Sequence, residues 1–445
     1  MKRVLMKFVA VLLTIVFLLP TWVFAESQDE VLKQNDVDRV CEDLTAEITC
    51  PTDIFNVHAT PGRDYDGYIF RLVEGVTIPC GEHKNIRVIF APKNIYHAAT
   101  LQDIMDFVAS ELIMYIEPDY LIFLDPMPLD QHILPTFVPH AFTSVNDPRY
   151  RDQWCLEFIR GAATWSTIPA ISTSGVVVAV IDSGIYRYHE DFNALNILRG
   201  RNFVHNEDSD DPLDDYGHGT AVTGIIAAIR NNGLGVASMA CGVTILPLRV
   251  LHGNPGRGAI SSIVSAIDYA VGHDVHVINM SLGASAQDLN MDSITSLTDA
   301  VNYAASKNIW MIAAVGNDWN ATINYPAGLA HVIGVGAISR DGVRAGFSNF
   351  NTSVFVTAPG EDLILLSPTG TGYIEDSGTS FAAPKITALA AYARAHNPNM
   401  TNLQFRDLLV RSSINRGDAN WDREYGHGII DAGLFMYNLT MRIHG

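Results

Sequence analysis

The chain has 445 residues, 48% of them hydrophobic and 17% charged, which is enough apolar material for a large core. This composition excludes an intrinsically disordered, collagen-like or coiled-coil protein. The 29 Lys and Arg residues against 48 Asp and Glu residues give a formal net charge of −19. That balance excludes nucleic acid as a main partner, because binding to phosphates depends on clustered cations.

The first 25 residues differ in character from those that follow. Basic residues near the start precede the apolar stretch VAVLLTIVFLLP and a small-residue ending, Val23-Phe24-Ala25. This order is typical of a secretory signal peptide, so we expect residues 1–25 to be removed and the protein to be secreted to the extracellular or cell-envelope space. The alternative is an uncleaved anchor, since the apolar stretch approaches spanning length. No later segment has 18 consecutive apolar residues, so we expect no stable membrane anchor after signal cleavage.

Five cysteines leave at least one thiol without a partner in the chain. They are Cys41, Cys50, Cys80, Cys155 and Cys241. No two of them form a CxxC pair, so their spacing suggests no zinc site. If the chain is cut between the third and the fourth, Cys155 and Cys241 are the only pair available in the larger piece, and the spacing does not decide whether they meet.

Before residue 146 the chain divides into three predicted segments. Residues 26–63 are polar and acidic. Residues 64–127 contain the strand-like runs YIFRLV, IRVIFA and YLIFLD, with a stretch of helical periodicity before the third, which predicts a small α+β domain. The apolar positions of that helical stretch are Leu101, Ile104, Met105, Val108 and Leu112. Residues 128–145 hold several prolines and no periodicity, so we predict a linker.

Residues 146–445 alternate between strand, turn and helix. Their apolar runs VVVAVID, VTILPLRVL, VHVINMSLG, IWMIAAVGN and HVIGVGAIS are continuous rather than alternating, as is typical of strands buried on both faces of a parallel sheet. Between them lie the helix-like stretches TAVTGIIAAIRNN, which we expect to be closed by Gly233, and ISSIVSAIDYAVGH. The predicted fold class is α/β, with a mainly parallel central sheet covered by helices.

Four polar residues lie where predicted strands end or helices begin. Asp182 ends VVVAVID and Asn317 follows IWMIAAVG, while His218 and Ser380 each open a helix. Taken singly, each has an ordinary explanation as a cap, a turn or a surface residue. Together they put an acid, an amide donor, a base and a hydroxyl at the edge of the sheet where α/β proteins bind ligands. That set is typical of nucleophilic acyl transfer.

Ser380 is the candidate nucleophile, because a hydroxyl can attack a carbonyl when a neighbouring base takes its proton. The helix that begins there offers backbone N–H groups and a positive dipole end to a developing oxyanion. We expect Pro384 to lie in the first turn of that helix, where its missing N–H is not needed.

Five ordered motifs resemble those of the subtilisin-like serine proteases: VVVAVIDSGI, YGHGTAVTGIIAA, INMSLG, AAVGND and SGTSFAAP. They follow that family's order of Asp, His and Ser, and the similarity runs from about Asp147 to about Asp431. The resemblance implies a three-layer subtilisin-like fold. It also implies a serine endopeptidase that acts on polypeptide substrates and requires no cofactor for its chemistry.

The same resemblance implies a role for each of the four residues. Asp182 would orient and support His218, which would act as general base and then as general acid. Ser380 would form the acyl-enzyme. Asn317 would donate its side-chain amide to the oxyanion beside the Ser380 N–H, and loss of such a donor typically costs about 10²–10³ in kcat.

Substrate-binding residues are also implied by the resemblance. Ser281, Leu282 and Gly283 match the segment that, in the family, pairs with an extended substrate backbone, although an ordinary strand end is the alternative. Gly283, Ala314 and Gly316 are candidate walls of the primary specificity pocket, since small residues there leave space for a substrate side chain.

Residues 64–127 correspond, by the same resemblance, to an N-terminal propeptide. Such a segment acts as an intramolecular inhibitor and folding chaperone, and the enzyme removes it by cutting itself. The autoprocessing site would then lie in the linker, between Leu134 and Asn146. The alternative is an accessory domain that the mature protein retains.

The match to the family weakens at calcium. Asp191 corresponds to a calcium-ligating aspartate, but the loop IRNNGLGVA is shorter than the family's ligand loop, so a structural calcium stays open and a turn cap explains Asp191 equally well. The run NEDSDDPLDD before His218 is a solvated loop, a cation-binding loop, or an acidic surface that sets Asp214 or Asp215 near the substrate residue next to the cleaved one. Acids there would also raise the pKa of His218.

Two other functions fit the sequence. A dedicated maturation protease would cut one cosecreted partner rather than bulk protein, and activity on casein separates the two. A catalytically silent binding module would keep the fold without the reaction, but it would not need Asp182, His218, Asn317 and Ser380 together.

Overall fold

The computed structural model describes residues 65–73, 76, 78, 86–104, 107, 112–123, 145–166, 172–205, 207, 210–254, 256–289, 294–367 and 372–441. All of these except Phe107 belong to one compact unit, residues 52–105 and 112–445. The predicted signal peptide, the acidic segment 26–63 and most of the predicted linker lie outside the described residues. In the described part of the chain, no helix is both long and apolar enough to cross a membrane.

A five-stranded antiparallel sheet is formed mostly by the N-terminal part of the described chain, in the order β2-β3-β1-β4-β9. The strands predicted in YIFRLV, IRVIFA and YLIFLD are confirmed, and the short β3 is added to them. We call β1 to β4 the N-terminal sheet. Its fifth strand, β9, comes from much later in the chain and pairs with the end of β4. The strands are β1 (Tyr65–Leu72), β2 (Ile86–Phe90), β3 (Ile95–Ala98), β4 (Ile113–Phe123) and β9 (Arg257–Ala259).

The helix predicted between the second and third runs falls only partly within the described residues. Leu101–Ile104 form a short 3-10 helix, η2, in which Ile104 is fully buried. Leu112 leads directly into β4, while Met105 and Val108 lie outside the described residues. A second 3-10 turn, η1 (Ala91–Lys93), connects β2 to β3.

The central sheet contains ten strands among the described residues, in the order β18-β19-β15-β14-β12-β10-β5-β8-β6, with β7 also beside β8. The pairs are parallel except β18 with β19. The five predicted apolar runs form β5, β8, β10, β12 and β14, so the predicted mainly parallel sheet is confirmed. The strands are β5 (Val177–Asp182), β6 (Asn196–Ile197), β7 (Arg201–Asn202), β8 (Thr244–Arg249), β10 (Val277–Met280), β12 (Trp310–Ala314), β14 (Val332–Ile338), β15 (Val354–Pro359), β18 (Ser413–Ile414) and β19 (Ile429–Ile430).

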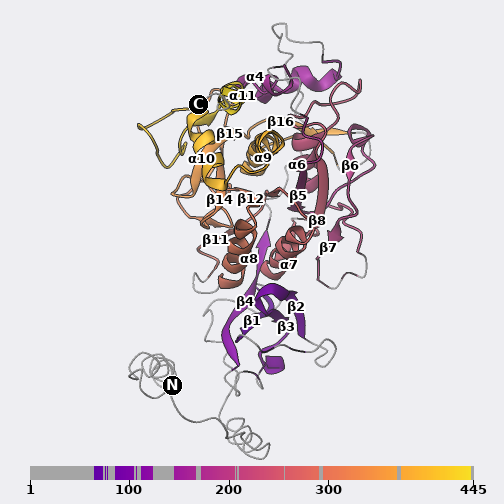
Figure 1. Cartoon of the computed structure of the whole chain (residues 1–445), viewed down its shortest axis with the longest axis vertical. Coiled ribbons are helices and arrows are strands. Elements are labelled where there is room, and N and C mark those ends of the chain that lie inside the picture. Colours follow the sequence, from indigo (N-terminus) through magenta and orange to yellow (C-terminus); the bar gives the residue numbers. More distant parts are fainter. Residues whose placement is uncertain are drawn as a thin grey trace, which may run out of the picture. The chain divides into compact units, whose positions relative to one another are not determined.

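Helices cover both faces of the central sheet and make a three-layer α/β fold (Figure 1). Successive strand residues point to opposite faces, so Val180 of β5 packs in the core with α6 and α9, and Ile181 packs in the core with α7 and α8. Helices α10 and α11 add to the first of these cores. The helices are α6 (His218–Ala227), α7 (Ile260–Val271), α8 (Thr295–Ser306), α9 (Thr379–His396), α10 (Asn402–Arg411) and α11 (Ala432–Met441).

Helix α6 is shorter than its sequence pattern predicts. It ends at Ala227, whereas we expected it to be closed by Gly233, so that prediction is wrong. Ala228 is extended, and the next N–H, of Ile229, donates to the backbone carbonyl of Asp191 rather than to the helix. The apolar pattern continues past the helix because Ala228 is buried in the core and Ile229 is half-buried, although neither is helical.

Short elements complete the described chain. Cys155, in α4, is buried, and it is not bonded to Cys241, since both are free thiols. The other three cysteines lie outside the described residues. The hairpin β16–β17 ends four residues before Ser380. The short elements are η3 (Pro148–Asp152), α4 (Trp154–Phe158), α5 (Ala163–Ser166), η4 (Glu190–Phe192), β11 (Ala284–Ser285), β13 (Asn324–Tyr325), β16 (Leu363–Leu366) and β17 (Tyr373–Asp376).

Candidate active site

Asp182 and His218 meet at the carboxyl edge of the central sheet. Asp182 is the last residue of β5 and His218 the first of α6. The Nδ1 atom of His218 lies 2.8 Å from Oδ1 of Asp182, and both side chains are buried. The predicted acid and base are therefore in direct contact.

Gly219 is required for this contact. A Cβ atom there would lie 2.2 Å from the carbonyl oxygen of Gly184 and 3.2 Å from Cβ of Asp182. Any side chain at position 219 would push the start of α6 away from the end of β5. The glycine of the motif YGHGT is thus explained by the close approach of two backbones.

Asp214 holds the start of α6 in place. Its carboxylate accepts the backbone N–H groups of Gly217 and Thr220 at 2.7 and 2.9 Å, and the hydroxyl groups of Ser183 and Thr220 at 2.8 and 2.6 Å. A carboxylate at a helix N-terminus satisfies orphan N–H groups and favours the positive end of the dipole. Because Asp214 is only 5% exposed and its carboxylate is engaged within the protein, its observed role is structural, and its place near a substrate residue stays a prediction.

Asp215 also has a protein partner. Its carboxylate accepts a hydrogen bond from the buried guanidinium of Arg249 at 2.9 Å. Half of its side chain remains exposed, so its proposed contact with substrate stays a prediction.

Several acids act on the pKa of His218. Burial alone would lower it, but the charge and hydrogen bond of Asp182, followed by the charges of Asp376 and Asp214, outweigh burial and raise it above its usual value. The predicted effect of neighbouring acids is in this direction. Asp376 was not predicted as part of the site, although it ends β17 just before the motif SGTS. Its own pKa is raised to about 6, chiefly by burial.

Ser380 lies in the first turn of α9, behind the N-cap Gly378. Its hydroxyl donates to the backbone carbonyl of Ser281 at 3.0 Å. His218 lies on the same side of the helix start, since its ring contacts that of Phe381, with ring centroids 5.3 Å apart. In this conformation the hydroxyl is bonded to Ser281, so it has to turn away from Ser281 to reach His218.

Pro384 is the sixth residue of α9, so the prediction that it lies in the first turn is wrong. At that position its missing N–H leaves the carbonyl of Ser380 without the usual helical donor. The hydroxyl of Ser281 supplies the replacement and donates to that carbonyl at 2.7 Å. Ser281 and Ser380 thus exchange two hydrogen bonds, which fix the strand-end segment against the helix.

Asn317 is oriented by Thr379. Its Oδ1 atom accepts both the backbone N–H and the hydroxyl of Thr379, each at 2.8 Å. The amide nitrogen, Nδ2, is then the atom left to donate elsewhere, and it lies near Gly378, at the helix end that carries Ser380. We call Asp182, His218, Asn317 and Ser380 the strand-end site.

The predicted substrate-binding residues lie around this site. Ser281 and Leu282 are buried, whereas Gly283, just before β11, is partly exposed. Ala314 ends β12 with 4% exposure. Gly316 has φ +105°, and a Cβ atom there would lie 2.2 Å from Nδ2 of Asn324, so no side chain fits. Their roles in substrate binding stay predictions.

Asp191 is surrounded by hydrogen-bond donors. Its carboxylate accepts the side-chain amide of Asn232 at 3.1 Å, the N–H of Val236 at 2.9 Å and the hydroxyl of Tyr373 at 3.0 Å. Calcium prefers six to eight oxygen ligands, so this ring of donors does not fit a calcium ion. The carboxylate joins segments distant in the chain rather than capping its own turn, and a metal role for Asp191 stays a prediction.

The N-terminal sheet contacts the α/β fold through two buried carboxylates of β4 that motif analysis did not find. Glu117 accepts the N–H groups of Thr295 and Ser296 at the start of α8, at 2.9 and 3.1 Å, and the Ser296 hydroxyl. Asp119 does the same at the start of α7, with the N–H of Ser261 at 2.8 Å and its hydroxyl. No local pattern in either segment reveals these contacts, because the partners are about 140 to 180 residues apart.

Two further contacts complete this boundary. Arg71 of β1 forms an ion pair with Asp299 of α8 at 3.1 Å, and β4 pairs with β9. Burial raises the pKa of Glu117 to about 8, although the donors of Ser296 and Thr295 lower it. We call Glu117, Asp119 and their partners the docking interface.

Comparisons with known proteins agree with this architecture. Residues 173–428 match the sequence profile of the Peptidase_S8, or subtilase, family. Subtilisin BL of Lederbergia lenta is 38% identical over 262 residues, 59% of this chain and 91% of that protein. The thermophilic serine proteinase of Bacillus sp. strain AK1 is 36% identical over 291 residues, 65% of this chain and 69% of that one. A solved structure titled as proteases from Pseudoalteromonas arctica PAMC 21717 matches with a TM-score of 0.59 and 30% identity, over 67% of this chain and 100% of that one.

Proposed function

The chain belongs to the subtilase family and is a serine endopeptidase, and from this premise we propose that Ser380 is the nucleophile that attacks the peptide carbonyl. Its base is His218, supported by Asp182. The observation that carries the proposal is the 2.8 Å contact between His218 and Asp182 at the start of α6, with Ser380 in the first turn of the neighbouring α9.

In the first half of the reaction, the Ser380 hydroxyl turns from the Ser281 carbonyl to His218. As Oγ bonds to the substrate carbonyl carbon, its proton passes to Nε2 of His218, and the carbonyl oxygen becomes an oxyanion. The Asn317 amide and the Ser380 N–H donate to that oxygen. The tetrahedral intermediate then expels the amine, which takes the proton from His218.

In the second half, a water molecule attacks the acyl-enzyme. His218 removes a proton from the water and returns it to Ser380 as the ester bond breaks. The contact between Asp182 and Nδ1 of His218 keeps Nε2 as the working nitrogen and stabilises the imidazolium formed in both halves. The proton of Ser380 thus leaves with the amine and the proton of the water returns to Ser380, so these steps need no cofactor.

We further propose that the protein is made as a secreted precursor. Residues 64–127 then form a pro-region that inhibits the hydrolysis of polypeptides by the peptidase domain of the same chain. The docking interface supports this, because β4 leads from the N-terminal sheet towards the linker while pairing with β9. The linker is then cut by the enzyme itself between Leu134 and Asn146.

The test compares the wild-type precursor with Ser380→Ala, following chain mass and casein hydrolysis over time. Ser306→Ala, which removes an exposed hydroxyl at the end of α8, is the matched control. We expect the wild type and the control to shorten to a piece that begins between residues 135 and 146 and to cleave casein. The Ser380→Ala chain should stay full length and inert. Equal processing in Ser380→Ala would overturn the assignment of the nucleophile.

A further inference from the structure

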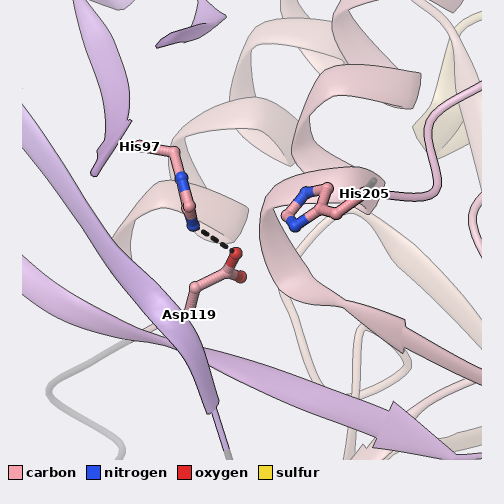
Figure 2. A group of neighbouring side chains, drawn as sticks. All are labelled: His97, Asp119 and His205. Carbon is pink, nitrogen blue, oxygen red and sulfur yellow. Dashed lines mark ion pairs between the residues drawn. The ribbon is translucent and has the colours of Figure 1, made fainter. Parts of the chain in front are cut away.

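Two histidines and one aspartate gather where the N-terminal sheet meets the α/β fold (Figure 2). His97 comes from β3, Asp119 from β4, and His205 from the segment after β7. One ligand atom from each lies within 4.8 Å of the other two. They belong to segments far apart in the chain, and no sequence motif predicts that they meet.

We propose that these three side chains bind one zinc ion, which links the pro-region to the peptidase domain. The link to the pro-region rests on the proposed function, whereas the zinc site itself does not. Two imidazoles and a carboxylate form a ligand set that zinc accepts, with the fourth tetrahedral position open to water.

The spacing suits a tetrahedral ion. Nε2 of His97 and Oδ2 of Asp119 lie 3.3 Å apart. Two ligands held about 2.0–2.1 Å from zinc at a tetrahedral angle are about 3.3 Å from each other. All three ligand atoms lie within 4.8 Å of one another, so His205 has to move by up to about 1.5 Å to complete the triangle.

The surroundings are those of a built site rather than a surface coincidence. Asp119 is fully buried and His97 is 7% exposed. Ser261 holds the Asp119 carboxylate through its N–H at 2.8 Å, and its hydroxyl lies 3.1 Å from Nε2 of His205. Such outer contacts fix the orientation of metal ligands. Gly67 leaves the space for the His97 ring, since a Cβ atom there would lie 2.8 Å from Nε2.

Arg87 is the competitor for this position. Its guanidinium contacts both ring nitrogens of His205 and reaches the Ser261 hydroxyl at 3.4 Å. A cation already lying against the imidazole opposes a second one by charge. Arg87 is exposed and long, so it can swing into solvent when zinc enters. Removing Arg87 should therefore raise the affinity for zinc instead of lowering it.

The position of the ligands decides what zinc would do. His97 and Asp119 belong to the proposed pro-region, and His205 to the peptidase domain, so neither part holds all three ligands after the linker is cut. Zinc bound only by the complex stabilises the complex by mass action. The ion would therefore delay release of the cut pro-region.

The first experiment measures metal binding on the full-length, untagged Ser380→Ala chain, which is not expected to process itself. Zinc is titrated calorimetrically, and cobalt is used as a coloured substitute. We expect one zinc per chain, and a loss of affinity of more than about 100-fold in His97→Ala and in His205→Ala, beyond the usual effect of losing an outer contact. His273→Ala, at an exposed histidine on the peptidase domain, should match the parent. Arg87→Ala should bind more tightly.

The outcomes separate folding from binding. His205 is only partly buried, so a circular dichroism spectrum like that of the parent shows that His205→Ala is folded. A folded His205→Ala and a His97→Ala chain that both bind zinc like the parent would overturn the site, as would the absence of stoichiometric binding. Weaker binding in Arg87→Ala would overturn the role given to that arginine.

A second experiment tests the link to the pro-region on the wild-type chain after self-cleavage. Release of the cut piece is followed by size-exclusion chromatography with zinc, or with a zinc-selective chelator in the presence of calcium. Zinc should slow release in the wild type and not in His205→Ala. Equal release rates overturn the link while leaving the binding site. If the wild type never cleaves itself, the proposed function fails and the zinc titration still stands alone.

Discussion

The strand-end site and the docking interface use the same kind of groups in opposite ways. The Glu117 carboxylate is engaged by N–H and O–H donors of the helix that it caps. At the strand-end site, by contrast, one oxygen of Asp182 has no hydrogen-bond partner in the described part of the chain, and Asn317 commits only its oxygen to Thr379. A docking surface is stable because its polar groups are satisfied, whereas a catalytic site keeps capacity for charge that appears during the reaction.

The largest effect should come from breaking the contact on which this capacity depends. In Asp182→Asn the amide cannot hold His218 in the tautomer that keeps Nε2 free as a base. We expect the rate constant of self-cleavage to fall by about 10⁴. Chain mass against time measures it.

Asp274→Asn is the control for Asp182→Asn, since Asp274 is exposed and precedes β10, at the opposite end of the parallel strands from the strand-end site. It should process like the wild type. Self-cleavage of Asp182→Asn at the wild-type rate would show that Asp182 has no part in the reaction.

The oxyanion donor is expected to matter less than the acid–base pair. Asn317→Ala removes the amide that Thr379 orients, and kcat on a peptide substrate should fall by about 10²–10³ with little change in KM, because the donor acts on charge formed in the transition state. Asn193→Ala, at an exposed asparagine, serves as the control. A rise in KM at constant kcat would instead place Asn317 in ground-state binding.

The strand-end site was predictable from the sequence because the topology of the sheet determines where its residues lie. Parallel strands bring their carboxyl ends to one edge, so Asp182, His218 and Ser380 could be placed together before any coordinates were known. The same reasoning located the central strands, whose burial on two faces leaves a continuous apolar signal.

Errors occurred where the outcome depended on a partner elsewhere in the chain. Pro384 is tolerated inside α9 because the Ser281 hydroxyl donates to the Ser380 carbonyl. Ser281 is distant in the sequence, so the residues around Pro384 do not predict this contact. Glu117, Asp119 and His205 were missed for the same reason. Asp376 had a local signal, its place just before SGTS, but a lone acid at that position is ordinary.

The docking interface can be tested at Glu117. Glu117→Ala leaves the first N–H groups of α8 unsatisfied in a buried place, which costs about 1–3 kcal/mol, so the cut pro-region should leave roughly 5- to 150-fold faster. The time from self-cleavage to full activity on casein measures this. Glu157→Gln, on exposed α4 surface, should leave the delay unchanged.

The pH dependence of that release follows from the raised pKa of Glu117. A carboxyl group whose pKa is about 8 in the complex and near 4.5 when free favours the complex while it is protonated. Its contribution is complete below about pH 4.5 and is lost as the pH rises through about 8. Wild-type release should therefore accelerate between pH 6 and 9, whereas Glu117→Gln should show no such acceleration. Acceleration of equal size in both chains would assign the pH dependence to another group.

The smallest effect is expected at Asp376, which shares one property with each of the two regions. This carboxyl is buried like those of the docking interface but has only the N–H of Ser377 as a hydrogen-bond donor in the described part of the chain, and its charge raises the pKa of His218. Since the pKa of Asp376 is about 6, it is charged above that pH, where His218 must lose its proton to act as a base. In Asp376→Asn the pKa of His218 falls, and the acidic limb of the profile of kcat/KM against pH moves to lower pH. Asp418→Asn, at an exposed acid, should not move it. A limb that stays in place in Asp376→Asn, with kcat/KM otherwise intact, would mean that Asp182 alone sets the basicity of His218.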